Sequence, residues 1–289
     1  MRFARLVALA LAALTLGALP ATAKPAIWTV RSAQATITLF GSIHLLPAGL
    51  DWRPAALDDA IAHADEIWFE LPIDPATDAA ASAIAIRRGV LVPDRHLAML
   101  LSPGEAARLA QAATTVGVPP AALDQMQPWL ADLTLSVAAD VLEGAEGSDG
   151  VEQQLQRLAP ASVPRRAFET PDQQIGFLAG GSVKDQLASL DWTLHEINDD
   201  PGSYKRIVGE WMAADVAGLQ RDAVDPVRRA SQGLYERLID QRNRHWAQVL
   251  AERLKKPGHI VVVVGAGHLV GEAGLPALLR ARGFAVEGP

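Results

Sequence analysis

The stretch Ile260-Val261-Val262-Val263-Val264-Gly265-Ala266-Gly267-His268-Leu269 decides the fold class of this chain. Its five consecutive β-branched residues predict a strand that is buried on both faces, as in a sheet covered by helices on each side. The glycines that follow let the backbone turn sharply and let other groups approach it closely. His268 is therefore expected just beyond the carboxyl end of a buried strand.

A second stretch far upstream repeats this layout. Residues 36–40 predict a strand and run into Gly41-Ser42-Ile43-His44, so both segments read as strand, Gly, two residues, His. Ligand crevices in open α/β sheets form outside the carboxyl ends of the strands. We therefore expect His44 and His268 to face one pocket, which would be the active site.

Glu70 is the third candidate residue. Residues 26–30 and 36–40 predict a hairpin, residues 55–64 a helix, and residues 66–71 the next strand, near whose carboxyl end Glu70 lies. A carboxylate there can simply pair with an arginine. Burying it beside two imidazoles is costly unless a cation or a proton is shared, which favours a functional role.

The middle of the chain is mostly helical. Ser102-Pro103-Gly104-Glu105 is a capping box that opens a helix towards residue 116, and residues 128–142 and 151–158 predict two more helices. Residues 143–150 form an acidic, glycine-rich loop, and residues 162–168 predict a short strand. Residues 183–256 predict four or five helices, broken at 200–202 and 225–226. The fold class is α/β, a central mixed sheet with a large helical insertion at about residues 75–256.

The N-terminus has the pattern of a secretory signal. Arg2 and Arg5 precede the apolar residues 6–19, and Ala21-Thr22-Ala23 fits a cleavage site, so residues 1–23 are expected to be removed and residues 24–289 to form a single periplasmic or secreted domain. An uncleaved anchor is the alternative. Losing Arg2 and Arg5 takes the net charge from −7 to −9, which argues against nucleic acid or an anionic membrane as a partner.

Each histidine also has a structural interpretation. A lone histidine in a turn is more often structural than catalytic, but two in the same register after strong strands favour function. The remaining histidines are interpreted as surface or core residues: His63, His96, His195, His245 and His259. The spacing Gly265-x-Gly267-x-x-x-Gly271 misses the dinucleotide fingerprint, and the tail is too short for a βαβ unit.

Several segments together resemble the TraB/GumN family, which is similar to the TIKI metalloproteases. They are the two Gly-x-x-His turns (41–47 and 264–269), Phe69-Glu70, Met126-Gln127-Pro128-Trp129, Phe168-Glu169-Thr170 and Arg242-Asn243. They fall in order from residue 36 to the C-terminus. The resemblance implies a metal-dependent, peptidase-like site that maps onto His44, Glu70 and His268, and a fold like those of TIKI, erythromycin-esterase and haem-binding ChaN-like proteins. The acidic loop leaves the roles of Asp149 and Glu152 open.

The chemistry of this residue set can be stated without the family. Because the chain has no cysteine, a metal site must use imidazole and carboxylate, and His44, Glu70 and His268 supply three ligands with a position open for water. Glu169 is the candidate proton shuttle. Arg242 is a candidate to bind a substrate carboxylate or oxyanion, with Asn243 donating a further hydrogen bond. Alternatively, Arg242 is a helix-surface residue facing Asp240 or Glu236.

The sequence thus predicts an exported metal-dependent hydrolase, most like a peptidase, with Mn, Co or Zn as the divalent metal. Its substrate is expected to be a peptide or another small molecule. Two alternatives stay open: a non-catalytic protein that binds a peptide, a pheromone-like signal or haem, and an accessory factor in envelope polysaccharide production. The substrate, the choice of metal and the oligomeric state are not fixed by the sequence.

Overall fold

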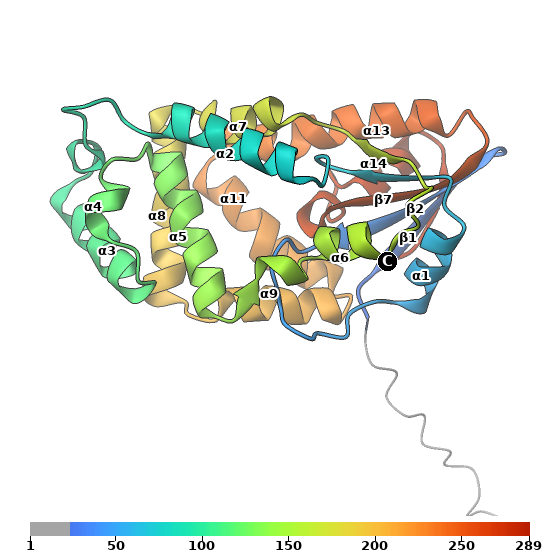
Figure 1. The fold of residues 1–289 in the computed structure, drawn as a ribbon, viewed down its shortest axis with the longest axis horizontal. Coiled ribbons are helices and arrows are strands. Elements are labelled where there is room, and N and C mark those ends of the chain that lie inside the picture. The colour runs from blue at the N-terminus through green and yellow to red at the C-terminus, as the bar shows by residue number, and fades with distance from the viewer. Residues whose placement is uncertain (1–23) are drawn as a thin grey trace, which may run out of the picture.

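A mixed sheet of six strands organises the computed structural model, which describes residues 24–289 (Figure 1). The strand order is β6 (Arg165–Ala167), β4 (Glu66–Phe69), β7 (Gly258–Gly265), β2 (Ala35–Ser42), β1 (Ile27–Arg31) and β8 (Ala285–Glu287). The first four are mutually parallel, β1 is antiparallel to β2, and β8 is antiparallel to β1. The predicted mixed α/β sheet is confirmed, whereas the expected signal segment, residues 1–23, lies outside the described residues.

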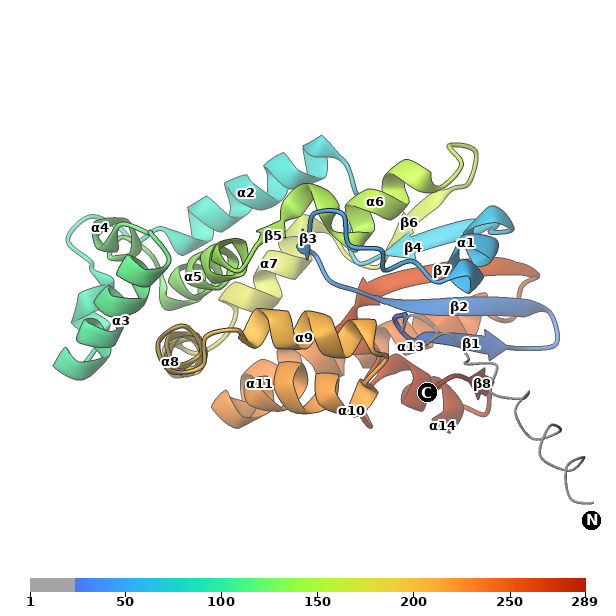
Figure 2. The same cartoon turned by 90° about the horizontal axis from the view of Figure 1, so that it is seen from below.

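Strand β7 is buried on both faces, as its run of β-branched residues predicts. Val261 and Val263 belong to the hydrophobic core on one face, and Val262 and Val264 to the core on the other. Helices α1 (Ala55–Ala62) and α6 (Val151–Leu158) cover the first face, and α13 (Gln241–Arg253) and α14 (Leu275–Ala281) cover the second (Figure 2). Each such valine contributes about 1.5–3 kcal/mol by burial, so the centre of the sheet is its most firmly held part.

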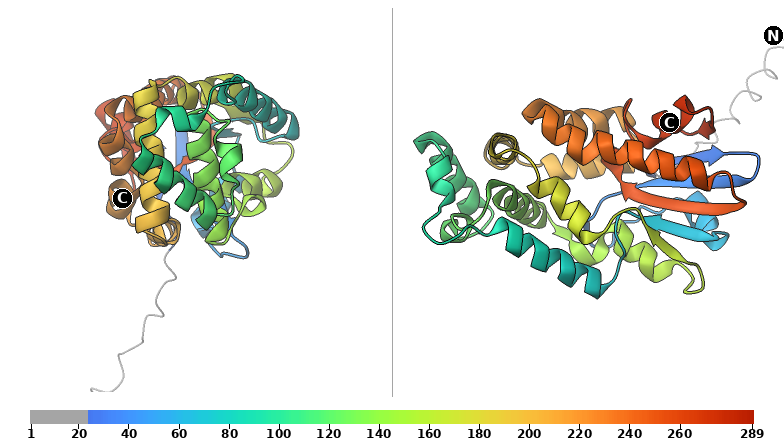
Figure 3. Two further views of the ribbon diagram at one scale, coloured as in Figure 1. Left: turned by 90° about the vertical axis from the view of Figure 1, so that its left-hand side faces the viewer. Right: turned by 90° about the horizontal axis from the view of Figure 1, so that it is seen from above.

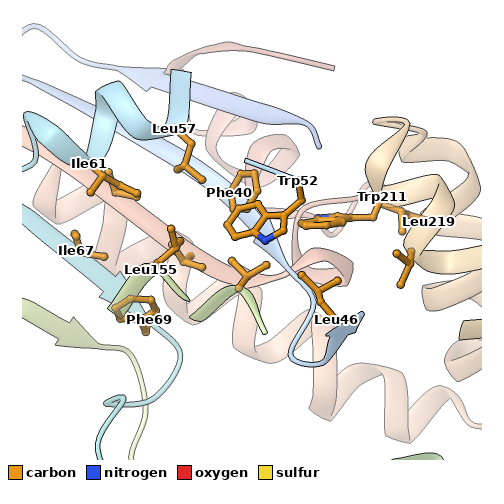
Figure 4. Packing of buried hydrophobic residues seen from close by; sticks show 14 of the residues in the cluster. Phe40, Leu46, Trp52, Leu57, Ile61, Ile67, Phe69, Leu155, Trp211 and Leu219 are labelled. Atoms are coloured by element: carbon orange, nitrogen blue, oxygen red, sulfur yellow. The ribbon is translucent and has the colours of Figure 1, made fainter. Parts of the chain in front are cut away.

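An aromatic cluster ties helix α9 (Ser203–Met212) to the first Gly-x-x-His turn (Figure 4). The rings of Phe40, Trp52 and Trp211 pack with centroid separations of 5.5, 6.1 and 5.7 Å. The indole Nε1 of Trp211 donates a hydrogen bond of 2.8 Å to the carbonyl oxygen of Gly41. This bond satisfies a buried carbonyl directly before the turn that carries His44.

The helical part of the chain has a hydrophobic core of its own, away from the sheet (Figures 1 and 3). Leu109, Leu135 and Leu194 lie in this core, on α3 (Pro103–Thr115), α5 (Pro128–Leu142) and α8 (Val183–Asp199). Helices α2 (Pro75–Gly89) and α7 (Pro171–Ala179) connect this helical part to the sheet (Figure 2). Two short helices, η1 (Leu97–Leu100) and α4 (Pro120–Leu123), lie between α2 and α5 in the chain. The capping box at Ser102 and Glu105 is confirmed.

The helices after α8 differ from the prediction in one place. The break at 200–202 is confirmed, with Gly202 at φ 96°. The break at 225–226 is wrong, because α10 (Val216–Leu219), η3 (Gln220–Val224) and α11 (Asp225–Ala230) follow one another without a gap. Segment η3 is a π-helix, and Pro226 lies in the first turn of α11, where a missing N–H is tolerated. The chain breaks instead at the extended Ser231, before α12 (Gln232–Tyr235), η4 (Glu236–Asp240) and α13.

The acidic loop is more ordered than predicted. It contains β5 (Ala145–Glu146), which pairs with β3 (Leu46–Pro47), and the 3-10 turn η2 (Gly147–Asp149). This pairing holds the start of α6 beside the turn that carries His44. Among residues 24–289, no helix has both the length and the apolar character needed to cross a membrane.

Candidate functional site

Four candidate side chains follow the four parallel strands, all at the same edge of the sheet. His44 follows β2, Glu70 follows β4, Glu169 follows β6, and His268 ends the 3-10 turn η5 (Ala266–His268) directly after β7. The carboxyl ends of parallel strands meet at one edge, and that is where ligand crevices form. The parallel register of β2 and β7, in which Ser42 pairs with Gly265, places the two Gly-x-x-His turns side by side. The expectation that both imidazoles face one pocket is not met, because His44 lines the pocket at this edge and His268 does not.

His44 is paired with a glutamate that sequence reasoning left open. Its Nδ1 lies 2.7 Å from Oε1 of Glu152, which also accepts a hydrogen bond of 2.5 Å from the Ser42 hydroxyl. The backbone N–H of Val151 donates to the carbonyl of Ile43 at 3.1 Å, so the first turn of α6 is fastened to the histidine turn. A side chain on Gly150 would overlap the carbonyl oxygen of His44, and only glycine permits this approach.

The electrostatics of His44 follow from this pair. Its side chain is 67% exposed, so solvent and ligands can reach the ring. The Glu152 carboxylate raises the pKa of His44 to about 9, against the opposing effect of desolvation. The pKa of Glu152 is lowered, since the charge and hydrogen bond of His44 and the hydroxyl of Ser42 outweigh the cost of its burial. An imidazolium paired with a carboxylate is therefore the stable form at neutral pH.

Arg242 lies at the centre of a second, buried group. It donates to both oxygens of Glu169 at 2.7 and 2.9 Å, to Glu70 at 2.5 Å and to the carbonyl of Leu238 at 3.1 Å, and its Nη1 lies 3.0 Å from Nε2 of His268. These contacts use all five guanidinium N–H groups. The alternative of a surface arginine is wrong, because Arg242 is 7% exposed. The expected substrate-binding role has no free N–H donor in this arrangement.

Asn243 holds His268 in one tautomer. Its Oδ1 lies 2.7 Å from Nδ1 of His268, and since Oδ1 can only accept, Nδ1 carries the proton and Nε2 accepts from Arg242. The Asn243 amide nitrogen donates to the carbonyls of His268 and Ala273, so both its ends are occupied by protein. Burial lowers the pKa of His268 to about 3, and the ring is neutral at physiological pH.

Glu70 joins the two groups. Its Oε1 accepts a hydrogen bond of 2.7 Å from the backbone N–H of Gly265, and its Oε2 pairs with Arg242. Burial opposes ionisation, but His268, Arg242, His44 and the Gly265 N–H together lower the pKa of Glu70 to about 2. The structure thus shows Glu70 paired with an arginine, which is the structural interpretation given for this residue above. Burial, partly offset by Arg242, raises the pKa of Glu169.

A pocket of about 300 Å³ lies against His44, Glu70, Glu152 and Gln174. Its apolar wall consists of Leu45, Leu71, Pro72 and Ile73. Residues Glu169, Arg242, Asn243 and His268 do not line it. The structure therefore divides the predicted set into a pocket layer, with His44 and Glu70, and a supporting layer behind it. Gln174 was missed, and the role of Glu152 was left open; the only sequence signal for Glu152 is its position in the first turn of a helix beside the acidic loop.

The predicted metal ligands do not form a metal site in this arrangement. Within residues 24–289, no group of three or more His, Asp or Glu side chains is placed to hold a metal ion. The physical reason is visible in the contacts of the three residues. His44 is turned to Glu152, while the Nε2 lone pair of His268 and one oxygen of Glu70 are directed at the Arg242 guanidinium.

Comparison with known proteins identifies the relatives of this chain. The model of the TraB/PrgY/gumN family matches residues 26–288. Uncharacterized protein YbaP of Escherichia coli (strain K12) is 27% identical over 243 residues, which cover 84% of this chain and 87% of YbaP, and YbaP of Shigella flexneri matches to the same extent. No solved structure matches the chain significantly. The match over nearly the whole described chain shows that this protein belongs to the TraB/PrgY/gumN family.

Proposed function

We propose that this chain is a hydrolase in which the His44 and Glu152 pair activates water against a carbonyl group, most like a peptidase. The observation that carries the proposal is the contact of 2.7 Å between Nδ1 of His44 and Glu152 at a pocket, with Nε2 of His44 making no hydrogen bond to any residue in 24–289. A histidine whose one nitrogen is held by a carboxylate presents the other nitrogen to a reactant.

The proton transfers follow from this orientation. His44 can act as a base only in its neutral form, which becomes populated as the pH approaches its pKa of about 9. In that form Nδ1–H donates to Glu152, and the unprotonated Nε2 accepts a proton from water as the water attacks the carbonyl. The resulting imidazolium is stabilised by Glu152 and then donates its proton to the leaving amine. General acid and base catalysis of this kind contributes about 10²–10⁴-fold to a rate.

The other pocket residues have supporting roles in the proposal. Glu70 stays ionised down to low pH and can accept a hydrogen bond from the attacking water. Two uncharged amide side chains, Gln153 and Gln174, line the pocket. Gln174, whose amide donates to Glu70 at 3.4 Å, is proposed to bind the developing oxyanion. Arg242 and Asn243 fix Glu70 and His268 from behind.

The substrate and the setting of the reaction are also proposals. The similarity to TIKI metalloproteases supports a peptide substrate, and the small pocket fits a few atoms on either side of one bond. We propose that residues 1–23 direct export to the periplasm or the medium. We further propose that the sheet with its helical additions is the fold of TIKI, erythromycin-esterase and ChaN-like proteins.

A metal-dependent peptidase, as the family resemblance implies, is the second candidate. It is favoured by the placement of His44, Glu70 and His268 at one edge of the sheet. The side-chain arrangement does not support it, since two of these donors are directed at Arg242.

Hydrolysis of a fluorogenic peptide library tests the proposal. The purified protein should release product in proportion to its concentration, and His44→Ala should reduce the rate by at least about 100-fold, the scale of a lost acid–base group. His63→Ala, an exposed histidine at the end of α1, is the matched control and should retain full activity. Equal cleavage by the wild type and a folded His44→Ala variant would disprove the assignment.

A further inference from the structure

We propose that the Arg242 guanidinium occupies the position between Glu70, Glu169 and His268 that a divalent metal would need. The cation of this site is then supplied by the protein's own side chain. The proposal concerns metal binding and does not depend on whether the protein hydrolyses peptides.

The donor set around the guanidinium resembles that of a metal site. Two carboxylates and one imidazole nitrogen converge on it, and these are the oxygen and nitrogen ligands that Zn²⁺ and Mn²⁺ take in proteins. The lone pair of His268 Nε2 faces Nη1 of Arg242 at 3.0 Å and is therefore not available to another cation.

The guanidinium is held firmly in its position. Its centre lies 4.7 Å from the ring centroid of Trp246 and 5.5 Å from that of Phe177, so its flat faces meet aromatic rings while its edge donates hydrogen bonds. A buried, bidentate and stacked arginine is pre-organised and cannot leave the site without stranding two carboxylates.

The charges of the group also disfavour an added metal ion. Glu70 and Glu169 bring two negative charges and Arg242 brings one positive charge, while His268 accepts a hydrogen bond from Arg242 through Nε2 and brings no charge. A divalent ion added beside the guanidinium would place two cations together in a buried environment, where their repulsion is poorly screened. The arginine and the metal should therefore exclude one another.

Metal binding to the purified wild type and its variants tests this exclusion. Equilibrium dialysis against Zn²⁺ and Mn²⁺, read by elemental analysis, should show no stoichiometric ion in the wild type. Arg242→Ala should gain one ion per chain, and Arg242→Ala with His268→Ala should lose at least about tenfold of that affinity. Arg244→Ala, an exposed arginine on the same helix, is the matched control and should bind no more metal than the wild type.

Guanidinium ion provides a second readout. In Arg242→Ala, millimolar guanidinium should displace the metal from the vacated place, whereas sodium chloride at equal ionic strength should not. Arg242→Lys, which keeps a charge, should bind no metal. Failure of folded Arg242→Ala to gain an ion would overturn the proposal.

The wild-type measurement decides the matter even where Arg242→Ala does not fold. One equivalent of metal in the wild type that is lost in Glu70→Gln or His268→Ala would show that arginine and metal coexist, and the proposal would be wrong. Absence of that ion supports it. Neither result depends on peptide cleavage, so this proposal and the proposed hydrolase activity can fail separately.

Discussion

His44 and His268 follow the same sequence pattern but have opposite pKa shifts. The first lies beside a carboxylate and is largely exposed, so its charged form is favoured; the second is buried and accepts a hydrogen bond from an arginine, so its neutral form is favoured. The local motif sets where each ring lies, and the neighbours from other elements set its protonation state.

The pairing of His44 with Glu152 predicts a measurable titration. Nuclear magnetic resonance should find the pKa of His44 near 9 in the wild type, and Glu152→Gln should bring it back towards the ordinary value of 6.5, because the carboxylate is the main cause of the shift. Glu146→Gln, an exposed glutamate on β5, should leave it unchanged. A pKa that does not move in Glu152→Gln would contradict the contact.

The buried group predicts loss of stability in acid. A lowered pKa in the folded state stabilises the protein above the unfolded value and is lost as pH falls, here from 6.5 to about 3 for His268 and from 4.5 to about 2 for Glu70. Urea unfolding should show Glu70→Gln less stable than the wild type by about 3 kcal/mol at pH 7.

This difference between Glu70→Gln and the wild type should shrink between pH 4.5 and pH 2, where the wild-type carboxylate itself becomes protonated. Asp172→Asn, which removes an exposed partner of Arg88, should cost less than about 1 kcal/mol. A pH-independent difference between Glu70→Gln and the wild type would refute the lowered pKa of Glu70.

At the scale of elements, the site depends on close backbone contacts between the two histidine turns and α6. A Cβ on Gly41 would lie 3.0 Å from the Cα of Ala266, so the first turn packs directly on the second. A Cβ on Gly150 would come closer still to the carbonyl oxygen of His44, and α6 begins directly after Gly150. The position of Glu152 is therefore fixed by backbone packing as well as by its own hydrogen bonds.

Substitutions at two glycines of one loop distinguish this close backbone packing from the general effects of changing a loop residue. Gly150→Ala should push α6 away from the His44 turn and destabilise the protein by about 1–3 kcal/mol, as overpacking does. Gly147→Ala adds a Cβ at an ordinary contact distance of 3.4 Å from Leu45 and should change stability by less than about 0.5 kcal/mol. Denaturant unfolding of both variants makes the comparison; equal effects would argue against the close approach.

The sequence predicts which elements carry the site residues better than it predicts which of these residues contact one another. The run at β7 and the repeated Gly-x-x-His layout are local patterns, so the strand, its turn and the shared sheet edge can be derived from them. Glu152 is 108 positions from His44, and the pairing of β3 with β5 helps to bring the two together. The acidic loop that contains β5 has no hydrophobic periodicity from which this pairing could be predicted. Arg242 similarly has no sequence signal that distinguishes a buried, five-donor arginine from an exposed one.

The whole molecule combines a sheet body with a helical end that has a separate hydrophobic core. The two cores on the sheet faces contain residues of β2 and β7. The buried residues of the third core come instead from η1, α3, α4, α5 and α8. The site lies on the sheet body. Disturbance of the third core should therefore reach the site only weakly.

Leu135→Ala tests this separation. Leu135 is fully buried in the third core, and its truncation should destabilise that core by about 2–5 kcal/mol. Hydrogen exchange should become faster in α3, α5 and α8 and stay near the wild-type rate in β2 and β7. A uniform increase in exchange across both parts would show that the molecule unfolds as one unit.

The central claim is that His44 and Glu152 act as one acid–base pair at the sheet edge. A double-mutant cycle on kcat/KM for peptide hydrolysis tests it most directly, because residues that act as a unit have strongly non-additive effects. Glu152→Gln should reduce kcat/KM by about 10–100-fold in the wild type, since it removes the group that orients the base, and should have almost no further effect in His44→Ala. Equal losses in both backgrounds would contradict the claim.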